Sequence, residues 1–431
     1  MGVVRIVELP RIEGHLDVEI EILGEDIRVR AMAREGIRIY DMILRGREYS
    51  EVPDIVSRMC GVCSVIHRVT SVMAIESALG ITPSDDILAL RELATIGGHV
   101  QSHLIHLFYF ILPDVLGIDS FIRLIDKNPG LIKKVMRIKG LANSIIEALS
   151  GRAVHPITTV NAETSFLPSR DKVYRILDEL KATKNITLDI SKIFLEAEFP
   201  DIPKEENFVS LASRDSINLL TGKISTTSGV MEPQAFLERI NAIVEEYSTA
   251  PHFLFDGKAY MVGSLSRLNN NYPLLNGSAR DLAKEFNLTF PSNSIFMNNK
   301  AQALEIVYFL ERAEEILGRL LEKDELKLQS EKKHGNNFGL AATEAPRGLL
   351  IHTYQLENGK IISANIITPT AQNLKNIEKN ASEYVRALLN NNFDLGEIRK
   401  QIEFLVRSYD PCISCAARFR KSNNLGKKLY K

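Results

Sequence analysis

The pattern of hydrophobic and polar positions predicts a mainly helical chain with a few short pairs of strands. Long stretches carry apolar residues three to four positions apart, as amphipathic helices do. A serine–aspartate cap opens one of these stretches, and Gly80 closes another. The predicted helices cover residues 35–47, 64–79, 84–112, 128–150, 171–198, 298–321, 371–391 and 395–408.

Strand periodicity appears in two main places. Residues 3–30 alternate apolar and polar positions around Gly24-Glu25-Asp26, which predicts an N-terminal β-hairpin. Residues 349–355 and 361–367 flank Asn358-Gly359, a strong signal for a second hairpin. Minor expectations are short strands near 208–211 and 260–263, a surface loop at 222–230, and a solvated connection at 323–333. The expected fold class is α+β, predominantly α-helical.

Composition and charge exclude several classes of function. The chain has 431 residues, of which 45% are hydrophobic and 25% are charged, as in ordinary globular proteins. Its formal net charge of −1 gives no reason to expect nucleic acid as a partner. No long uncharged apolar stretch predicts a membrane span, and the N-terminus lacks a signal-peptide pattern.

All four cysteines lie in two CxxC pairs at opposite ends of the chain. The first pair is in Arg58-Met59-Cys60-Gly61-Val62-Cys63, and the second is in Asp410-Pro411-Cys412-Ile413-Ser414-Cys415. This usage predicts one tetrathiolate metal site that forms only when most of the chain has folded. Sulfur ligands suit zinc, iron, nickel and iron–sulfur clusters.

Several alternatives to a redox metal stay open at this point. A structural zinc could be bound by four thiolates, although zinc ribbons usually place their pairs close together in sequence. Two thioredoxin-like dithiols are disfavoured because no βαβ pattern surrounds either pair. Disulfides within a CxxC are strained, and paired thiols without an export signal favour metal binding in a reducing, cytoplasmic compartment.

The cysteine motifs carry a family resemblance. Together with Arg11-Ile12-Glu13-Gly14-His15 and Thr343-Glu344-Ala345-Pro346-Arg347-Gly348, they resemble the large subunit of nickel–iron hydrogenases. The second run is similar to the cytosolic, cofactor-coupled branch, which includes sulfhydrogenases that exchange electrons with NADP. The resemblance implies a central helix bundle with small peripheral antiparallel sheets. It also implies a single catalytic unit over residues 1–418.

The resemblance implies a binuclear metal site at the cysteines. Cys60 and Cys412 would be terminal nickel ligands, and Cys63 and Cys415 would bridge nickel and iron. Family members carry carbon monoxide and cyanide on the iron. Cys63 precedes the helix predicted at 64–79, whose N-terminal partial charge favours a thiolate.

Acid–base residues are implied beside the metals. Glu13 alone would be read as a surface carboxylate, but the family uses this glutamate as the first proton acceptor. Burial can raise a carboxyl pKa toward neutrality and suit it to that role. Arg347 would lie over the metal pair, where it would bind cyanide and position or act as a base. Pro346 would fix the backbone before it.

Three further residues match family positions around the site. His67 would lie beside a bridging sulfur, Thr370 would hydrogen-bond a cyanide, and Asp114 would pair with an arginine above the metals. Each residue taken alone fits ordinary helix or turn chemistry equally well. The histidines at 99, 103 and 106 share a helix face, yet we expect them to pack in the core, because the cysteines already satisfy the metals.

A second metal site matches the family at one ligand position and differs from it at another. Asp41 falls where the family has an acidic ligand to a small structural metal, often magnesium. Many relatives bind the same ion through a histidine three residues after the last cysteine, and here that position is Arg418. A guanidinium cannot ligate a metal, because it stays protonated. We therefore expect a salt bridge from Arg418 to Asp41 or Glu35 in place of the ion.

The partners follow from what the chain lacks. No cysteines remain for iron–sulfur clusters, so a cluster-bearing small subunit is expected. No G-x-G-x-x-G unit is present, so flavin and NADP would be bound by diaphorase subunits. Residues 419–431 form a basic tail that resembles the family's C-terminal extension. A maturation endopeptidase would cut it between Arg418 and Phe419.

The resulting prediction is the catalytic subunit of a soluble nickel–iron hydrogenase. It would split H2 reversibly and pass electrons through the small subunit to NADP or a similar acceptor. Two other functions remain as alternatives. One is a respiratory-complex core subunit of the same fold that has lost its metals. The other is a non-catalytic, zinc-stabilised assembly protein, in which Glu13 and Arg347 would have no purpose.

Overall fold

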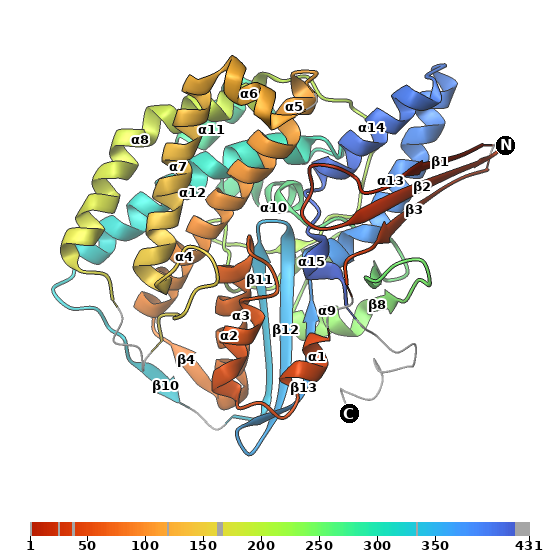
Figure 1. The fold of residues 1–431 in the computed structure, drawn as a ribbon. Helices are drawn as coiled ribbons and strands as arrows, with labels where there is room; N and C mark the ends of the chain where they lie inside the picture. The colour runs from red at the N-terminus through yellow and green to blue at the C-terminus, as the bar shows by residue number, and fades with distance from the viewer. Residues whose placement is uncertain are drawn as a thin grey trace.

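The computed structural model describes residues 2–24, 26–36, 39–118, 120–161, 167–332 and 335–418. Its framework is a layer of long helices, at the left of Figure 1. Helix α4 packs against α7 and α12, and α8 packs against the same two helices. Their bounds are α4 Asp85–Leu104, α7 Pro129–Ser150, α8 Arg170–Glu196 and α12 Met297–Leu321.

The long helices begin and end where the capping signals predict. Ser84 Oγ accepts the N–H of Ile87 at 3.4 Å, and Asn128 Oδ1 accepts that of Leu131 at 3.0 Å. Helix α3 (Ser64–Leu79) ends at Gly80, whose φ of 70° is left-handed. The predicted helices at 64–79, 128–150, 171–198, 298–321, 371–391 and 395–408 are confirmed to within a few residues.

The predicted helix at 84–112 is longer and less regular than expected. After α4 the chain widens into a π-helical segment, η2 (Ile105–Ile111), and continues as α5 (Leu112–Val115). The predicted end at residue 112 is therefore three residues short, because α5 continues to Val115. Pro113 lies in the first turn of α5, directly after the π-helical segment.

The predicted helix at 35–47 is mostly wrong. Only α1 (Tyr40–Leu44) forms, and residues 37–38 lie outside the described part. Leu44 is its one buried residue, while Met42 is 63% exposed, so a longer helix would bury little apolar surface. The remaining helices are η1 Tyr49–Glu51, α2 Val52–Val56, α6 Phe121–Lys127, α9 Pro233–Arg239, α10 Ser264–Asn271, η3 Tyr272–Leu274, α11 Gly277–Glu285, α13 Pro369–Asn390, α14 Leu395–Ser408 and α15 Ile413–Ala416.

The N-terminal sheet contains the predicted hairpin and one more strand. Strands β2 (Leu16–Leu23) and β3 (Asp26–Ala33) pair antiparallel, and β1 (Gly2–Ile6) pairs with the free edge of β2. Alternate side chains of β2 and β3 face a core to which α13 contributes. This sheet extends to the right in Figure 1.

The second predicted hairpin is confirmed as β12 (Gly348–Glu357) and β13 (Lys360–Ile367), with both turn residues at positive φ. A strand not anticipated, β11 (Phe338–Ala345), pairs with the other side of β12. Helix α3 approaches this sheet so closely that a Cβ on Gly339 would lie 1.9 Å from the carbonyl oxygen of Ala74. The sheet is largely buried and lies against α3, the helix that follows the first cysteine pair.

Two of the minor expectations are wrong. Residues 222–230 contain the paired strands β6 (Ile224–Thr226) and β7 (Gly229–Met231), because Ile224 and Thr226 are buried by alternation. The strand expected near 260–263 is reduced to a single bridge between Phe208 and Met261. The described part of the stretch at 323–333 is mostly exposed, as predicted, although Lys323 pairs with Asp86 and β10 pairs with β4. The remaining strand bounds are β4 Ile81–Pro83, β5 Ser210–Leu211, β8 Ile240–Ile243, β9 His252–Phe255 and β10 Ser330–Lys332.

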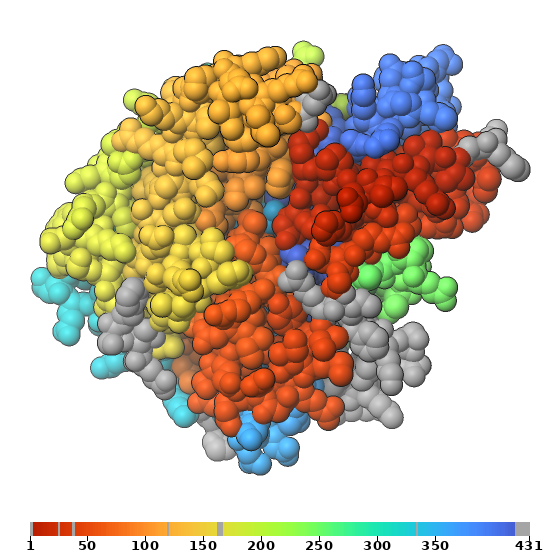
Figure 2. All heavy atoms as spheres, viewed as in Figure 1, coloured from red at the N-terminus to blue at the C-terminus, as the bar shows by residue number. Residues whose placement is uncertain are grey.

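The core has two apolar parts with the cysteines forming their own cluster. The terminal segments meet there, because Ile413 N donates to the carbonyl oxygen of Glu13 at 2.9 Å. Figure 2 shows the N-terminal residues in red adjoining the orange residues near 40–75 on one face. Within the described ranges, every helix is too short or too polar to span a bilayer.

Candidate metal centre

The two CxxC pairs are brought together by elements from opposite ends of the chain. Cys63 is the residue immediately before α3, and Cys412 is the residue immediately before α15. All four sulfur atoms lie within 4.8 Å of one another, and all four residues are buried. The predicted tetrathiolate cluster is therefore present in the fold, and the thiols are free.

The cluster's chemistry fits metal cations. Cys412 Sγ lies 3.3 Å from Cys60 Sγ and 2.9 Å from Cys415 Sγ. The pKa of Cys60 is held well below its usual value, chiefly by hydrogen bonds from the neighbouring thiols, while burial raises the pKa of Cys412. Soft divalent cations would allow all four thiols to ionise.

Arg347 occupies the tip of a two-residue turn that joins β11 to β12. Ala345 pairs with Gly348, so Pro346 and Arg347 are the turn residues, and proline fixes the first φ. The Arg347 guanidinium donates to Cys63 Sγ at 3.2 Å and to Asp410 Oδ1 at 2.8 Å. Burial by itself lowers its pKa, but Asp410 and the sulfurs raise the pKa well above its usual value. The side chain is therefore a fixed cation beside the cluster.

Glu13 lies on the other side of the second cysteine pair. Its carboxylate accepts the Ser414 hydroxyl and, at 3.1 Å, the Ser414 backbone N–H. Burial, and then the negative charge of Cys60, raise the pKa of Glu13 above that of an exposed glutamate. A carboxyl with a raised pKa accepts a proton more readily than an exposed glutamate does.

Thr370 and His67 both lie within the buried shell around the sulfurs. Thr370 Oγ1 accepts the backbone N–H of Cys412 at 2.8 Å, which leaves its own hydroxyl hydrogen available. His67 lies in the first turns of α3, and its Nδ1 faces Nε2 of His352 at 3.1 Å. Burial lowers the pKa of His67 to about 4, so its imidazole is neutral at neutral pH.

Asp114 is one step removed from the cysteines. It binds Arg11 at 2.6 Å and Arg407 at 2.7 Å, both arginines being close in sequence to Glu13 or Cys412. The acid that binds the arginine beside the sulfurs is Asp410, which the sequence reasoning did not select. Its signal was its place in the Asp-Pro-Cys motif, two residues before Cys412. Ser102, a 3.2 Å acceptor for Arg347, was also missed.

The histidines of α4 and η2 are used in packing, as expected. His99 Nδ1 lies 2.9 Å from the carbonyl oxygen of Thr95, and His103 pairs with Glu305. His106 contacts Gln302 and the carbonyl oxygen of Arg407. Among the described residues, the four cysteines are the one group whose geometry could hold a metal ion.

The residues near Asp41 do not fit a magnesium ion. The expected ion pair is present, with Arg418 Nη1 at 3.7 Å from Asp41 Oδ1. The Arg418 side chain is almost fully buried, so its positive charge occupies the space beside the carboxylate. A divalent cation placed there would be repelled by the guanidinium and would lack a ligand from position 418.

The fold and the site together define a chain with four buried thiols that could hold metal, with Arg347 and Glu13 beside them. A family model described as nickel-dependent hydrogenase matches residues 38–129 and 223–418. The chain belongs to this nickel-dependent hydrogenase family and is a catalytic large subunit. The predicted fold class and the predicted hydrogenase activity are thereby confirmed.

Curated relatives agree with this assignment over nearly the whole chain. The sulfhydrogenase 1 alpha subunit of Pyrococcus furiosus is 33% identical over 96% of this chain and 97% of its own. The sulfhydrogenase 2 alpha subunit of the same organism is 33% identical over 97% and 100%. The beta subunit of the NAD-reducing hydrogenase of Cupriavidus necator is 25% identical over 94% and 92%.

Solved structures show the same architecture. An NAD+-reducing [NiFe]-hydrogenase in the H2-reduced state superposes with a TM-score of 0.83 and 25% identity, over 97% of this chain and 100% of that one. A [NiFeSe]-hydrogenase of Dm. baculatum gives a TM-score of 0.74 at 20% identity, over 97% and 100%. The second comparison supports the fold alone.

Proposed function

We propose that the tetrathiolate holds a nickel–iron pair, with carbon monoxide and cyanide on the iron. Cys60, Cys63, Cys412 and Cys415 would together hold the two metals through their sulfur atoms. Two observations support the proposal. The four buried sulfur atoms lie within 4.8 Å of one another, and Arg347 donates a hydrogen bond to Cys63 Sγ. When bound, such a pair supplies the Lewis-acid and redox chemistry that splits H2 into two electrons and two protons.

The protein's own groups would manage orientation and proton movement. Arg347 is held on Asp410 and can donate to a small anionic ligand beside Cys63 without moving. Glu13, hydrogen-bonded to Ser414 between the two sulfurs of the second pair, would receive a proton from Cys412 and pass it outward. Burial of the whole set keeps bulk water away from the reacting atoms.

The other predicted residues would support this arrangement. Thr370 would donate its free hydroxyl hydrogen to a cyanide while it holds the backbone of Cys412. Pro346 would fix the turn that carries Arg347, and His67 would support the first cysteine loop as a neutral imidazole. Asp114 would hold Arg11 and Arg407 together, and thereby join the segments that carry Glu13 and Cys412.

Electron transfer would need partner subunits. All four cysteines are used in the cluster, so an iron–sulfur small subunit would carry electrons away, and diaphorase subunits with flavin would reduce NADP or a similar acceptor. The relatives are named as subunits of sulfhydrogenases and of an NAD-reducing hydrogenase, which supports this division. The free thiols suit a cytoplasmic, reducing location.

The acceptor can be tested with the complex purified by a tag on this chain. We expect a cluster-bearing small subunit to co-purify and H2 to drive NADP reduction faster than NAD reduction. H2 oxidation with an artificial dye but with neither nucleotide would refute the diaphorase partners and leave the hydrogenase activity intact.

Residues 419–431 lie outside the described part of the structure, and their removal remains a proposal. A maturation endopeptidase would cut between Arg418 and Phe419 after nickel insertion. Intact mass spectrometry of active, nickel-loaded protein should then show a chain that ends at Arg418. An active form that retains Lys431 would contradict the proposed unit of residues 1–418.

Replacing Glu13 should slow proton transfer. Glu13→Gln keeps the side chain's shape and can bind Ser414, but it cannot accept a proton, so we expect the rate of H2 oxidation to fall by about 10²-fold with nickel content unchanged. The raised pKa of Glu13 predicts an acidic limb, with activity falling as pH drops through a value above that of exposed glutamates. The variant should lack this limb.

The control for this variant is Glu19→Gln in β2. Glu19 binds Arg5 and Arg30 on the same N-terminal sheet and contacts no cysteine among its described hydrogen bonds. It should oxidise H2 at the normal rate with the normal pH profile. A Glu13→Gln enzyme that behaves in the same way would show that protons leave by another route.

Because Arg418 pairs with Asp41, magnesium should have no effect on the thermal stability of the protein. Adding millimolar Mg2+, or EDTA for a short incubation, should shift the melting temperature by less than about 1 °C, because nothing binds selectively to the native state. Metal analysis should likewise find no stoichiometric magnesium. A stabilisation that grows with Mg2+ concentration would show that Asp41 is a metal ligand after all.

A further inference from the structure

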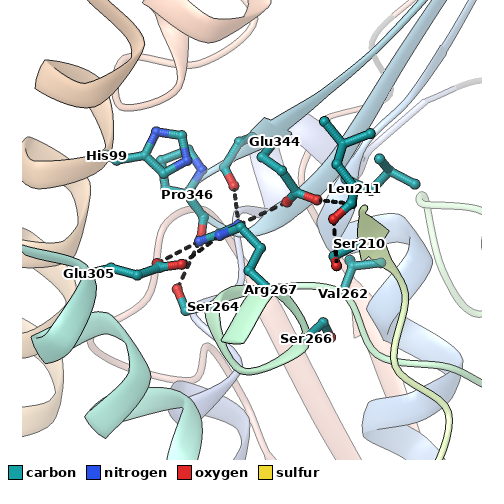
Figure 3. A network of polar contacts seen from close by, with 12 residues as sticks. His99, Ser210, Leu211, Val262, Ser264, Ser266, Arg267, Glu305, Glu344 and Pro346 are labelled. Carbon is teal, nitrogen blue, oxygen red and sulfur yellow. Dashed lines mark hydrogen bonds and ion pairs between the residues drawn. The ribbon is translucent and has the colours of Figure 1, made fainter. Parts of the chain in front are cut away.

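A second charged cluster lies beneath the turn that carries Arg347, and the functions above do not use it. Its centre is Arg267 in α10, whose side chain is 0% exposed. Arg267 binds both carboxylate oxygens of Glu305 at 2.7 Å and Glu344 Oε2 at 3.0 Å. His103 also contacts Glu305, with its Nε2 at 2.9 Å from Oε2. Figure 3 shows the guanidinium between the two carboxylates.

The rest of the guanidinium is directed at the backbone of the turn. Nη1 of Arg267 donates to the carbonyl oxygen of Ala345 at 2.9 Å, and Nη2 donates to that of Pro346 at 3.0 Å. Figure 3 shows the second of these contacts reaching Pro346. These two peptide groups come immediately before Arg347. Their orientation sets the direction in which the Arg347 side chain leaves the backbone.

The turn is also pressed directly against the start of α10. Gly348 has a φ of 123°, and a Cβ there would lie 2.6 Å from the backbone nitrogen of Gly263 and from Val262 Cβ. Only glycine allows this approach. Arg267 lies one helical turn beyond Gly263 and donates its backbone N–H to the Gly263 carbonyl at 2.9 Å. A movement of Arg267 would therefore be transmitted to the turn.

The cluster and the Arg347 guanidinium share helix α4. His103 belongs to the cluster, while the preceding Ser102 accepts a hydrogen bond from Arg347 Nη1 at 3.2 Å. Both the backbone and the head group of Arg347 are thus tied to elements that Arg267 and Glu305 connect. The connected elements are α4, α10, α12 and the end of β11.

The cluster is not explained by a contribution to the stability of the fold. One buried arginine with two buried carboxylates is costly to desolvate, and an apolar replacement is often as stable. Burial raises the pKa of Glu344 to about 7, which shows that its charge is poorly compensated. The charged cluster does, however, fix the direction of the two carbonyl groups before Arg347, because Arg267 donates to both. Apolar side chains in its place could not do this.

We propose that Arg267 is a positioning residue for Arg347: it holds the two peptide groups before Arg347 so that the guanidinium is fixed beside Cys63. This inference rests on the proposed role of Arg347 in H2 cleavage. It assigns no contact between Arg267 and substrate or metal. It predicts that Arg267 affects the reaction only through Arg347.

The test begins with Arg267→Lys, because lysine keeps the charge but cannot bind Glu305 and both carbonyl groups at once. We expect the turnover rate for H2 oxidation to fall by about 30- to 100-fold, since a misplacement of about 1 Å can cost as much. Nickel content and the KM for H2 should stay near normal. A normal rate with a lowered melting temperature would overturn the proposal.

A matched control is available in the same fold. Arg91 is as buried as Arg267, binds both oxygens of Glu76 at 2.6–2.7 Å, and donates to the carbonyl oxygen of Val160 at 2.8 Å. Arg91→Lys makes the same chemical change in a buried ion pair outside the Arg347 network. It should reduce stability by a similar amount and leave the turnover rate within about twofold of normal.

The double variant separates positioning from a general structural effect. If Arg267 acts through Arg347, adding Arg267→Lys to Arg347→Lys should lower H2–D2O exchange by less than about twofold, although each change alone has a large effect. Multiplied losses would contradict the proposal. A normal rate for Arg347→Lys would instead remove the role assigned to Arg347, which is a failure of the proposed function.

Glu344→Gln decides the question if Arg267→Lys does not fold. Glutamine has the shape of the protonated carboxyl, so the fold should persist, but Arg267 loses one charged partner. A fall of about 3- to 10-fold in turnover rate, absent in the Arg347→Lys background, would support the proposal. An unchanged rate with normal nickel content would refute it.

Discussion

Cys412→Ser is expected to abolish H2 oxidation, with a loss of at least about 10³-fold, and to remove most of the nickel. Cys412 lies closest to two other sulfurs, at 3.3 and 2.9 Å, and Glu13 contacts the residues that follow it. A serine hydroxyl is a harder ligand and stays protonated at neutral pH, so one ligand of the proposed nickel would be lost. Nickel content and activity should fall together in the same preparation.

The control for Cys412→Ser is Val62→Ala in the first cysteine loop. Val62 packs against the four sulfurs but offers no ligand atom. It should cost stability, as small core truncations do, and retain nickel. A Cys412→Ser protein that keeps both nickel and activity would show that the metal lies elsewhere.

The second large effect is expected for Arg347→Lys, with a loss of about 10²- to 10³-fold in turnover rate and metal content unchanged. Lysine preserves the charge. It cannot, however, bind Asp410 through two nitrogens and at the same time reach Cys63 and Ser102, as Arg347 does. The effect should therefore appear in the rate of H2 cleavage and isotope exchange, and only weakly in the KM for H2.

Arg91→Lys again serves as the comparison for Arg347→Lys, since it weakens a buried bidentate arginine without touching the cysteine cluster. If both variants lose activity in proportion to lost stability, the effect of Arg347 would be structural. A normal rate for Arg347→Lys would remove its proposed role in H2 cleavage.

Local signals were sufficient for much of the fold. Residues 64–79 have both a clear apolar pattern and a terminating glycine, and α3 has these bounds. Asn358-Gly359 determined the β12–β13 turn in the same way. In contrast, β11 was missed although its whole length pairs with β12, because Gly339 and its alanines allow close contact with α3 instead of following a strand pattern. Packing between segments that are distant in sequence leaves no alternation of polar and apolar residues that would reveal the strand.

The site residues could likewise be predicted only where a local motif marks them. The cysteines could be selected by type and spacing, and Glu13 and Arg347 by their motifs. Arg267 could not, because its segment, although similar to the cofactor-coupled branch of the family, suggests no chemistry by itself, and its partners, Glu305 and Glu344, come from other parts of the chain. Asp410 was visible in the motif, but only the structure shows that it binds Arg347. Partners of buried charges are set by tertiary structure.

The most direct test is metal analysis of the purified complex together with an infrared spectrum of the same sample. We predict close to one nickel per copy of this subunit, iron bound beside it, and absorption bands from carbon monoxide and cyanide. Most of each signal should be lost in Cys412→Ser. Zinc as the only metal in this subunit, with no such bands, would contradict the proposed centre and remove the catalytic roles assigned to Glu13 and Arg347.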